Sequence, residues 1–120
     1  MAIKIVLSGD GLESERIDRL TRELLTDIRA DVDPAASLPK AAGGIGAKGA
    51  DVLIGVILAA INMGVVGKLV VALSSYLNRN RKISFDVQKP DGSKLKLSYE
   101  YVRGKQADEI TAAVTDFLKK

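Results

Sequence analysis

The longest apolar stretch of this chain covers residues 52–77 and carries a single formal charge, at Lys68. A membrane-spanning helix needs about 20 apolar residues, so the stretch is long enough to cross a bilayer if the lysine head reaches the interface. A single span, however, would separate the strand predicted at the N-terminus from those predicted near the C-terminus. The stretch must therefore be buried in lipid, in the core or against another protein.

A break is expected near residues 62–67, because Asn62 and Gly64 are typical helix-ending residues. Two short helices in a tight hairpin would then keep both ends on one side. The first, over residues 52–61, is apolar nearly all round, which is typical of a helix buried in a core, an oligomer or lipid. Packing in protein and membrane engagement are given equal weight. The candidate contact residues are Val52, Ile54, Ile57, Leu58, Ile61, Val66, Leu69, Val70 and Leu73, followed by a basic flank of Arg79, Arg81 and Lys82.

The segments around this stretch have simpler patterns. Residues 2–8 alternate apolar and polar side chains and predict a strand. A helix follows to about Asp31, after a capping-box spacing at Asp10 and Glu13 and with an exposed i,i+4 pair of Asp18 and Arg22. Residues 83–87 and 95–101 also alternate and flank a Pro-Asp-Gly-Ser turn, so they predict a hairpin. A last helix is expected over residues 105–118.

These elements predict a single α+β domain over residues 1–120. The first strand joins the C-terminal hairpin in a small three-stranded sheet, and amphipathic helices cover one face of it. Residues 32–50 form a linker, because two prolines there prevent a continuous helix. Residues 51–78 form a central apolar helical region.

Composition excludes several kinds of chemistry. The chain contains no cysteine and no histidine, so Cys/His zinc sites and histidine-activated nucleophiles are impossible. Gly44, Gly46 and Gly49 match the G-x-G-x-x-G spacing of dinucleotide sites, but a proline-containing linker precedes them where such a site needs a strand. We therefore predict no catalytic residues, no metal and no cofactor.

Charge is distributed unevenly along the chain. Residues 1–50 hold seven basic and eight acidic side chains, whereas residues 79–120 hold ten basic and six acidic ones. A basic surface of this kind can meet phosphates or anionic lipid, although an ordinary solvated surface is the favoured interpretation. No specific nucleic-acid binding is predicted.

Several segments together resemble the bacterial effector-associated constant component family. They are "LLTDIRADVD", "PKAAGGIGAKGADVL", "ALSSYLNRNRKISFDV" and "DGSKLKLSYE". The resemblance covers nearly the whole chain and includes no catalytic signature. Gly44, Gly46, Arg79 and Arg81 fit the family pattern, while Tyr76 stands where members often carry tryptophan.

The resemblance implies a non-enzymatic adaptor or effector component of a bacterial defence (conflict) system. Such a component would act by self-association and by membrane insertion or pore formation through its apolar region. Its expected partners are copies of itself and a protease or effector, and its expected location is the cytoplasm, with recruitment to the inner membrane. The alternative is a cytosolic protein–protein interaction domain whose apolar segment is simply core.

Overall fold

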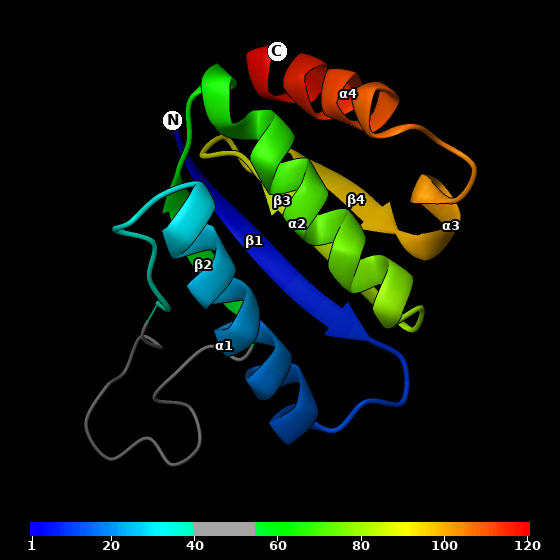
Figure 1. Cartoon of the computed structure of the whole chain (residues 1–120). Helices are drawn as coiled ribbons and strands as arrows, with labels where there is room; N and C mark the ends of the chain where they lie inside the picture. Colours follow the sequence, from blue (N-terminus) through cyan, green and yellow to red (C-terminus); the bar gives the residue numbers. More distant parts are fainter. Residues whose placement is uncertain (40–54) are drawn as a thin grey trace.

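A computed structural model describes residues 1–39 and 55–120 and shows an α+β fold in two layers (Figure 1). Residues 40–54 lie outside the described residues, and with them Val52, Ile54 and the three glycines of the dinucleotide-like spacing. The elements are β1 (Ala2–Gly9), α1 (Ser14–Asp31), β2 (Val56–Ala60), the 3-10 turn η1 (Met63–Val65), α2 (Val66–Arg79), β3 (Ile83–Gln88), β4 (Lys94–Ser98), α3 (Tyr99–Val102) and α4 (Ala107–Lys119).

The four strands form one antiparallel sheet in the order β2-β1-β3-β4. The register places Ile5 of β1 between Ile57 of β2 and Val87 of β3. The expected α+β class, the first strand and the C-terminal hairpin are confirmed, but the sheet has four strands where three were predicted. The additional strand β2 comes from the segment predicted as a helix.

The helical prediction for residues 52–61 is wrong where the structure describes it, because Val56–Ala60 is a strand. A short run that is apolar on every side has no periodicity that separates a buried strand from a buried helix. An interruption does fall within the predicted residues 62–67, but it separates a strand from a helix. The Asn62 side chain accepts a hydrogen bond of 2.8 Å from the Gly64 N–H and caps the start of η1, so it does not end a helix. The central region is therefore a strand, a turn and one helix.

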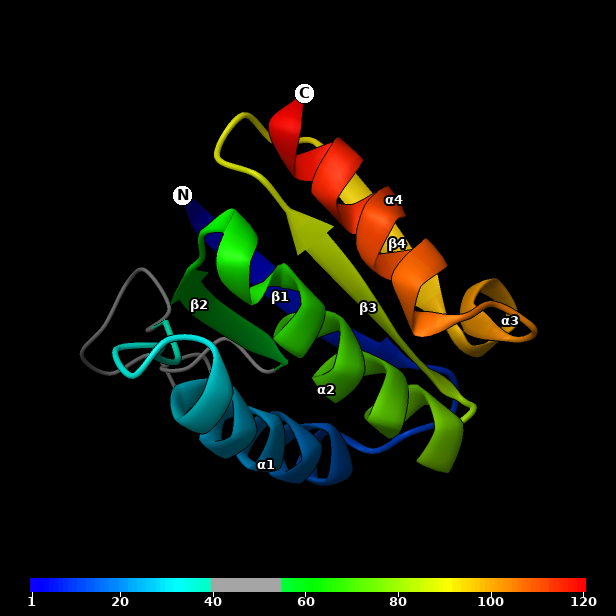
Figure 2. The same ribbon diagram turned by 45° about the horizontal axis from the view of Figure 1, so that its top comes forward.

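The helices α1, α2 and α4 lie on the same face of the sheet, as Figures 1 and 2 show. Alternate strand residues and one stripe of each helix meet between the two layers, which explains both the period of two in the strands and the helical stripes. The largest fully buried side chains are Phe85, Ile5, Leu24, Ile28, Ile57, Leu69, Leu73, Leu77, Ile83, Leu97 and Leu118.

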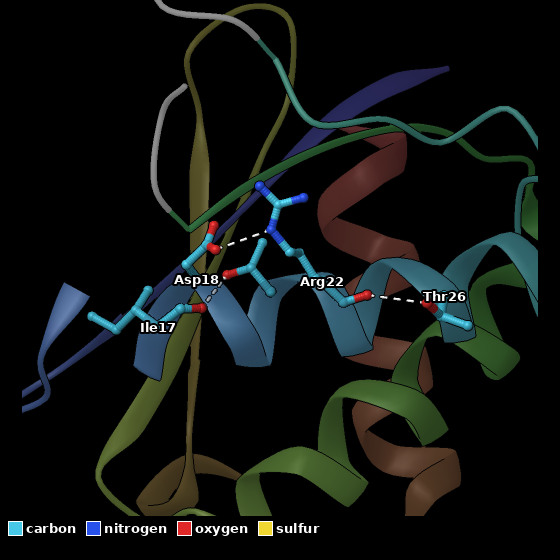
Figure 3. Close-up of polar contacts among 5 residues, drawn as sticks. Ile17, Asp18, Arg22 and Thr26 are labelled. Atoms are coloured by element: carbon cyan, nitrogen blue, oxygen red, sulfur yellow. Dashed lines mark hydrogen bonds and ion pairs between the residues drawn. The ribbon is translucent and has the colours of Figure 1, made fainter. Parts of the chain in front are cut away.

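The exposed side of α1 carries local polar contacts (Figure 3). The Arg22 Nε lies 3.0 Å from the Asp18 Oδ2, which confirms this predicted i,i+4 pair. The hydroxyl of Thr26 donates to the Arg22 carbonyl at 3.1 Å. The helix begins without the predicted capping box, since its N-cap is Glu13 and no side chain caps it.

The C-terminal third also differs in detail from the prediction. The last strand ends at Ser98, although the alternation continues to Tyr101. The Ser98 Oγ accepts a hydrogen bond of 3.2 Å from the Tyr101 N–H and caps the short helix α3. A serine able to cap a helix therefore overrides the strand pattern here. The last helix starts at Ala107, two residues later than expected.

Gly55 allows β2 to begin directly beside β1. Its φ angle is +82°, and a β-carbon at this position would collide with the carbonyl oxygen of Leu7. The Leu7 N–H donates to the Gly55 carbonyl at 2.6 Å. A glycine is needed because only this residue accepts both the left-handed backbone and the close approach.

Candidate interaction surfaces

Most of the predicted contact residues lie inside the fold. Ile57, Ile61, Val66, Leu69, Val70 and Leu73 are each at most 3% exposed. They pack with the sheet and the other helices in one core. The exception is Leu58, which is 36% exposed on the opposite face of β2. The six buried residues belong to the core and cannot act as a contact surface while the protein is folded.

In the part of the chain that the structure describes, no helix combines the length and the apolar character that a bilayer crossing demands. The stripe of α2 that was considered for lipid faces the sheet. Lipid could reach it only if the helix left the core, which would expose the apolar face of the sheet to water at the same time.

A groove lies between α1 and α2 in the helical layer. Its volume is about 460 Å³, and its lining includes Val71, which is 59% exposed. Gly67 and Ala72 line it as small residues, so the valine stands clear of its neighbours on α2. The complete lining is Asp27, Asp31, Gly67, Lys68, Val71, Ala72, Ser75 and Tyr76.

Tyr76 lines this groove and joins α2 to α1. The residue is 3% exposed, and its hydroxyl donates a hydrogen bond of 2.9 Å to the Asp27 carboxylate. Burial, then this hydrogen bond and the negative charges of Asp27 and Glu23, raise the pKa of the Tyr76 phenol to about 12. The Arg79 guanidinium lies 4.7 Å from the ring centroid. Tyr76 is therefore held by several contacts.

The charges around the groove have both signs. Asp27 and Asp31 come from α1, whereas Lys68 comes from α2. Val71 therefore lies as a single exposed apolar side chain among charged groups of both signs. Val71 is not among the predicted contact residues because it lies off the buried stripe of α2. The one indication in the sequence was that Val71 is apolar although it shares the polar side of the helix with Lys68, Ser74 and Ser75.

The predicted basic flank lies in a second groove, of about 350 Å³, at the C-terminal end of α2. Arg79, Arg81 and Lys82 line it together with Arg16 from the first turn of α1. The three cations predicted as a basic flank thus lie together in one groove. Arg16 is a fourth cation in this groove. Its position in the sequence does not predict this, because the packing of α1 beside α2 brings it there.

Comparisons of the chain with protein-family models, with curated proteins and with solved structures gave no match. Within residues 1–39 and 55–120, no cluster of three or more aspartates or glutamates is placed to hold a metal ion.

Proposed function

We propose that this chain is a non-enzymatic adaptor or effector component of a bacterial defence system that acts by binding proteins, beginning with a second copy of itself. The defence setting is supported by the resemblance of the sequence to the effector-associated constant component family. The mode of action is supported by the α1–α2 groove. The observation that carries the proposal is the exposure of Val71 in that groove.

An exposed valine in a groove gives association a driving force. Full burial of such a side chain contributes roughly 1.5–3 kcal/mol, and Val71, which is 59% exposed, can gain only part of that amount. Ala72 and Gly67 beside it would let another helix approach closely, because they add little bulk. Neighbouring polar groups then orient the contact, as the rim of an interface commonly does.

The distribution of charge favours a second copy as the occupant. The groove carries carboxylates from α1 and the Lys68 ammonium from α2. A surface that contains both signs can be complementary to itself across a two-fold axis, and two-fold dimers are the commonest symmetric assemblies. A protease or effector partner would use the face of the dimer that this contact leaves free.

Membrane insertion and pore formation are not part of this proposed mode of action. The apolar residues that such steps would need, such as Leu69 and Leu73, are buried in the core. Association through Val71 needs no opening of the fold. A cytoplasmic location is part of the proposal, as are a protease or effector partner and the absence of an enzymatic step.

Sedimentation equilibrium over a range of protein concentrations tests the self-association. We expect the average mass of the parent protein to rise towards that of a dimer, and Val71→Asp to remain a monomer because a charge replaces the apolar contact. Met63→Asp is the matched control, since Met63 is 40% exposed but lies outside the groove lining. It should associate like the parent. A parent protein that stays monomeric, or a Val71→Asp variant that still dimerises, would refute the contact.

The adaptor role needs a separate experiment. The chain can be co-expressed with a protease or effector encoded beside its gene and purified through a tag on the chain. Co-purification of that protein with the parent and with Met63→Asp would support the adaptor role. If no neighbouring protein co-purifies even when the chain dimerises, the adaptor role fails while the self-association stands.

A further inference from the structure

The basic groove lies where β1 ends and β3 begins. Four of its lining residues, Arg16, Arg79, Arg81 and Lys82, are cations, and none of the lining residues is a carboxylate. They come from the first turn of α1, the last turn of α2 and the short connection to β3. Like charges repel one another, so their concentration in one groove costs stability unless something offsets it.

The three guanidinium groups are held in place by neutral partners. The Arg16 Nη2 donates a hydrogen bond of 3.3 Å to the Asn80 Oδ1. The guanidinium carbon of Arg79 lies 4.7 Å from the Tyr76 ring centroid, and that of Arg81 lies 4.6 Å from the Tyr99 ring centroid. Stacking uses the face of a guanidinium and leaves its N–H edge for hydrogen bonds.

The cations of this groove also lack acidic partners within the described part of the chain. The ion pairs found in the described part of the chain join Arg22 to Asp18, Lys89 to Asp91 and Arg103 to Glu100. All of them lie outside the groove. Cations without acidic partners that are fixed by stacking keep both their charge and their orientation available. An anionic ligand would therefore meet groups that need little reordering, which lowers the entropic cost of binding.

The helix dipole of α2 can account for only part of the positive charge in this groove. Its carbonyl end, at Arg79, carries roughly half a negative charge, which one nearby cation can offset. The other three cations, each with a full charge, exceed that need. The lining residues therefore carry more positive charge than the helix C-terminus offsets.

Gly9 shapes the apolar floor of the groove. A β-carbon built on Gly9 would lie 2.5 Å from the Leu12 Cδ1 and 3.3 Å from the Lys82 carbonyl oxygen. The absence of a side chain thus lets Leu12 approach the start of β3. Leu12 and Ile83 line the groove between the cations and give it an apolar part.

We infer that this groove binds a phosphate group. Arginine edges match the geometry of phosphate oxygens and can bond them in pairs. The volume of about 350 Å³ falls at the small end of the range, about 300–1,000 Å³, that is usual for small-molecule sites. The phosphate belongs either to a free phosphorylated compound or to a lipid headgroup. The site is distinct from the α1–α2 groove and does not depend on self-association.

Two probes and two variants test the inference at constant ionic strength. The probes are pyrophosphate, followed by backbone amide NMR shifts, and phosphatidylcholine vesicles with and without phosphatidylglycerol, followed by sedimentation. Arg16→Gln/Arg81→Gln removes two cations of the groove. Lys94→Gln/Lys96→Gln removes the same charge from β4, outside the groove. Thermal unfolding of all proteins checks that each variant is folded.

We expect a saturable response centred on residues 9–12 and 79–83, at least about tenfold weaker in the Arg16/Arg81 variant and within about twofold of the parent in the lysine variant. Such a response to pyrophosphate identifies a free phosphorylated compound as the ligand class. Binding only to vesicles that contain phosphatidylglycerol, with the same dependence on the arginines, identifies a headgroup. The inference is overturned if neither probe gives a saturable response, or if both variants lose binding equally, because net charge alone would then account for it.

Discussion

The Tyr76 hydroxyl of α2 lies 2.9 Å from the Asp27 carboxylate of α1 and joins the two helices in the lining of the α1–α2 groove. The sequence places these residues 49 positions apart.

Removal of this hydroxyl should lower stability and alter its dependence on alkaline pH. Tyr76→Phe should lose about 0.5–1.5 kcal/mol near neutral pH, the usual net value of one hydrogen bond. The pKa of the phenol is about 12 in the folded protein against 10.0 for an ordinary tyrosine. Unfolded chains therefore release this proton first, so its contribution is complete below pH 10 and is lost as the pH rises towards 12.

Urea unfolding of the parent and of Tyr76→Phe at several pH values between 8 and 11 measures this effect. The difference in unfolding free energy between the two proteins should shrink as the pH rises. A difference that stays constant across this range would contradict the raised pKa.

Two neighbouring residues of β2 lie on opposite faces of the sheet, one in the core and one at the surface. Ile57 is 1% exposed beneath the helices, whereas Leu58 is 36% exposed on the other face. Ile57→Glu should unfold the domain, because burial of an unpaired carboxylate costs several kcal/mol against a typical total stability of about 5–15 kcal/mol. Leu58→Glu should retain the parent circular dichroism and melting curve. A folded Ile57→Glu protein would show that this position is not core.

The β3–β4 turn should depend on Gly92. Its φ angle is +92°, as the turn prediction required, and no atom lies near the place of a β-carbon. Gly92→Val should cost on the order of 1–3 kcal/mol through backbone strain alone. Gly67→Ala, within α2 and also free of close neighbours, should instead stabilise by about 0.5–1 kcal/mol. Denaturant midpoints that move in the same direction for both variants would contradict this assignment.

Lys89 links the β3–β4 turn to the end of α4. This residue is 7% exposed, its Nζ donates a hydrogen bond of 2.7 Å to the Lys120 carbonyl, and the ammonium lies 5.0 Å from the Phe117 ring centroid. Lys89→Met keeps the length of the side chain but removes these contacts, so we expect a loss of about 1–3 kcal/mol. Lys94→Met, at an exposed position of β4, should change stability by less than about 0.5 kcal/mol. Equal denaturant midpoints for Lys89→Met and the parent would show that the link contributes nothing.

Local patterns were sufficient for most elements. The alternation at Ile3, Ile5 and Leu7 and the stripe at Leu69, Leu73 and Leu77 identify a strand and a helix, because side chains that share a face must share an environment. Pro90 and Gly92 identify the turn for a similar reason, since their backbone preferences are local. The expected small α+β class follows from these elements.

Tertiary structure decided what local patterns could not. Residues 56–60 are apolar on both faces and became an edge strand because β1 offered them an unpaired edge and Gly55 let the backbones approach. The same pairing placed Ile57, one of the expected contact residues, in the core. Likewise, Arg16 joins Arg81 in one groove only because α1 packs beside α2. The sequence by itself determined the periodicity of each segment, whereas the pairing of distant segments determined which apolar and charged residues remained at the surface.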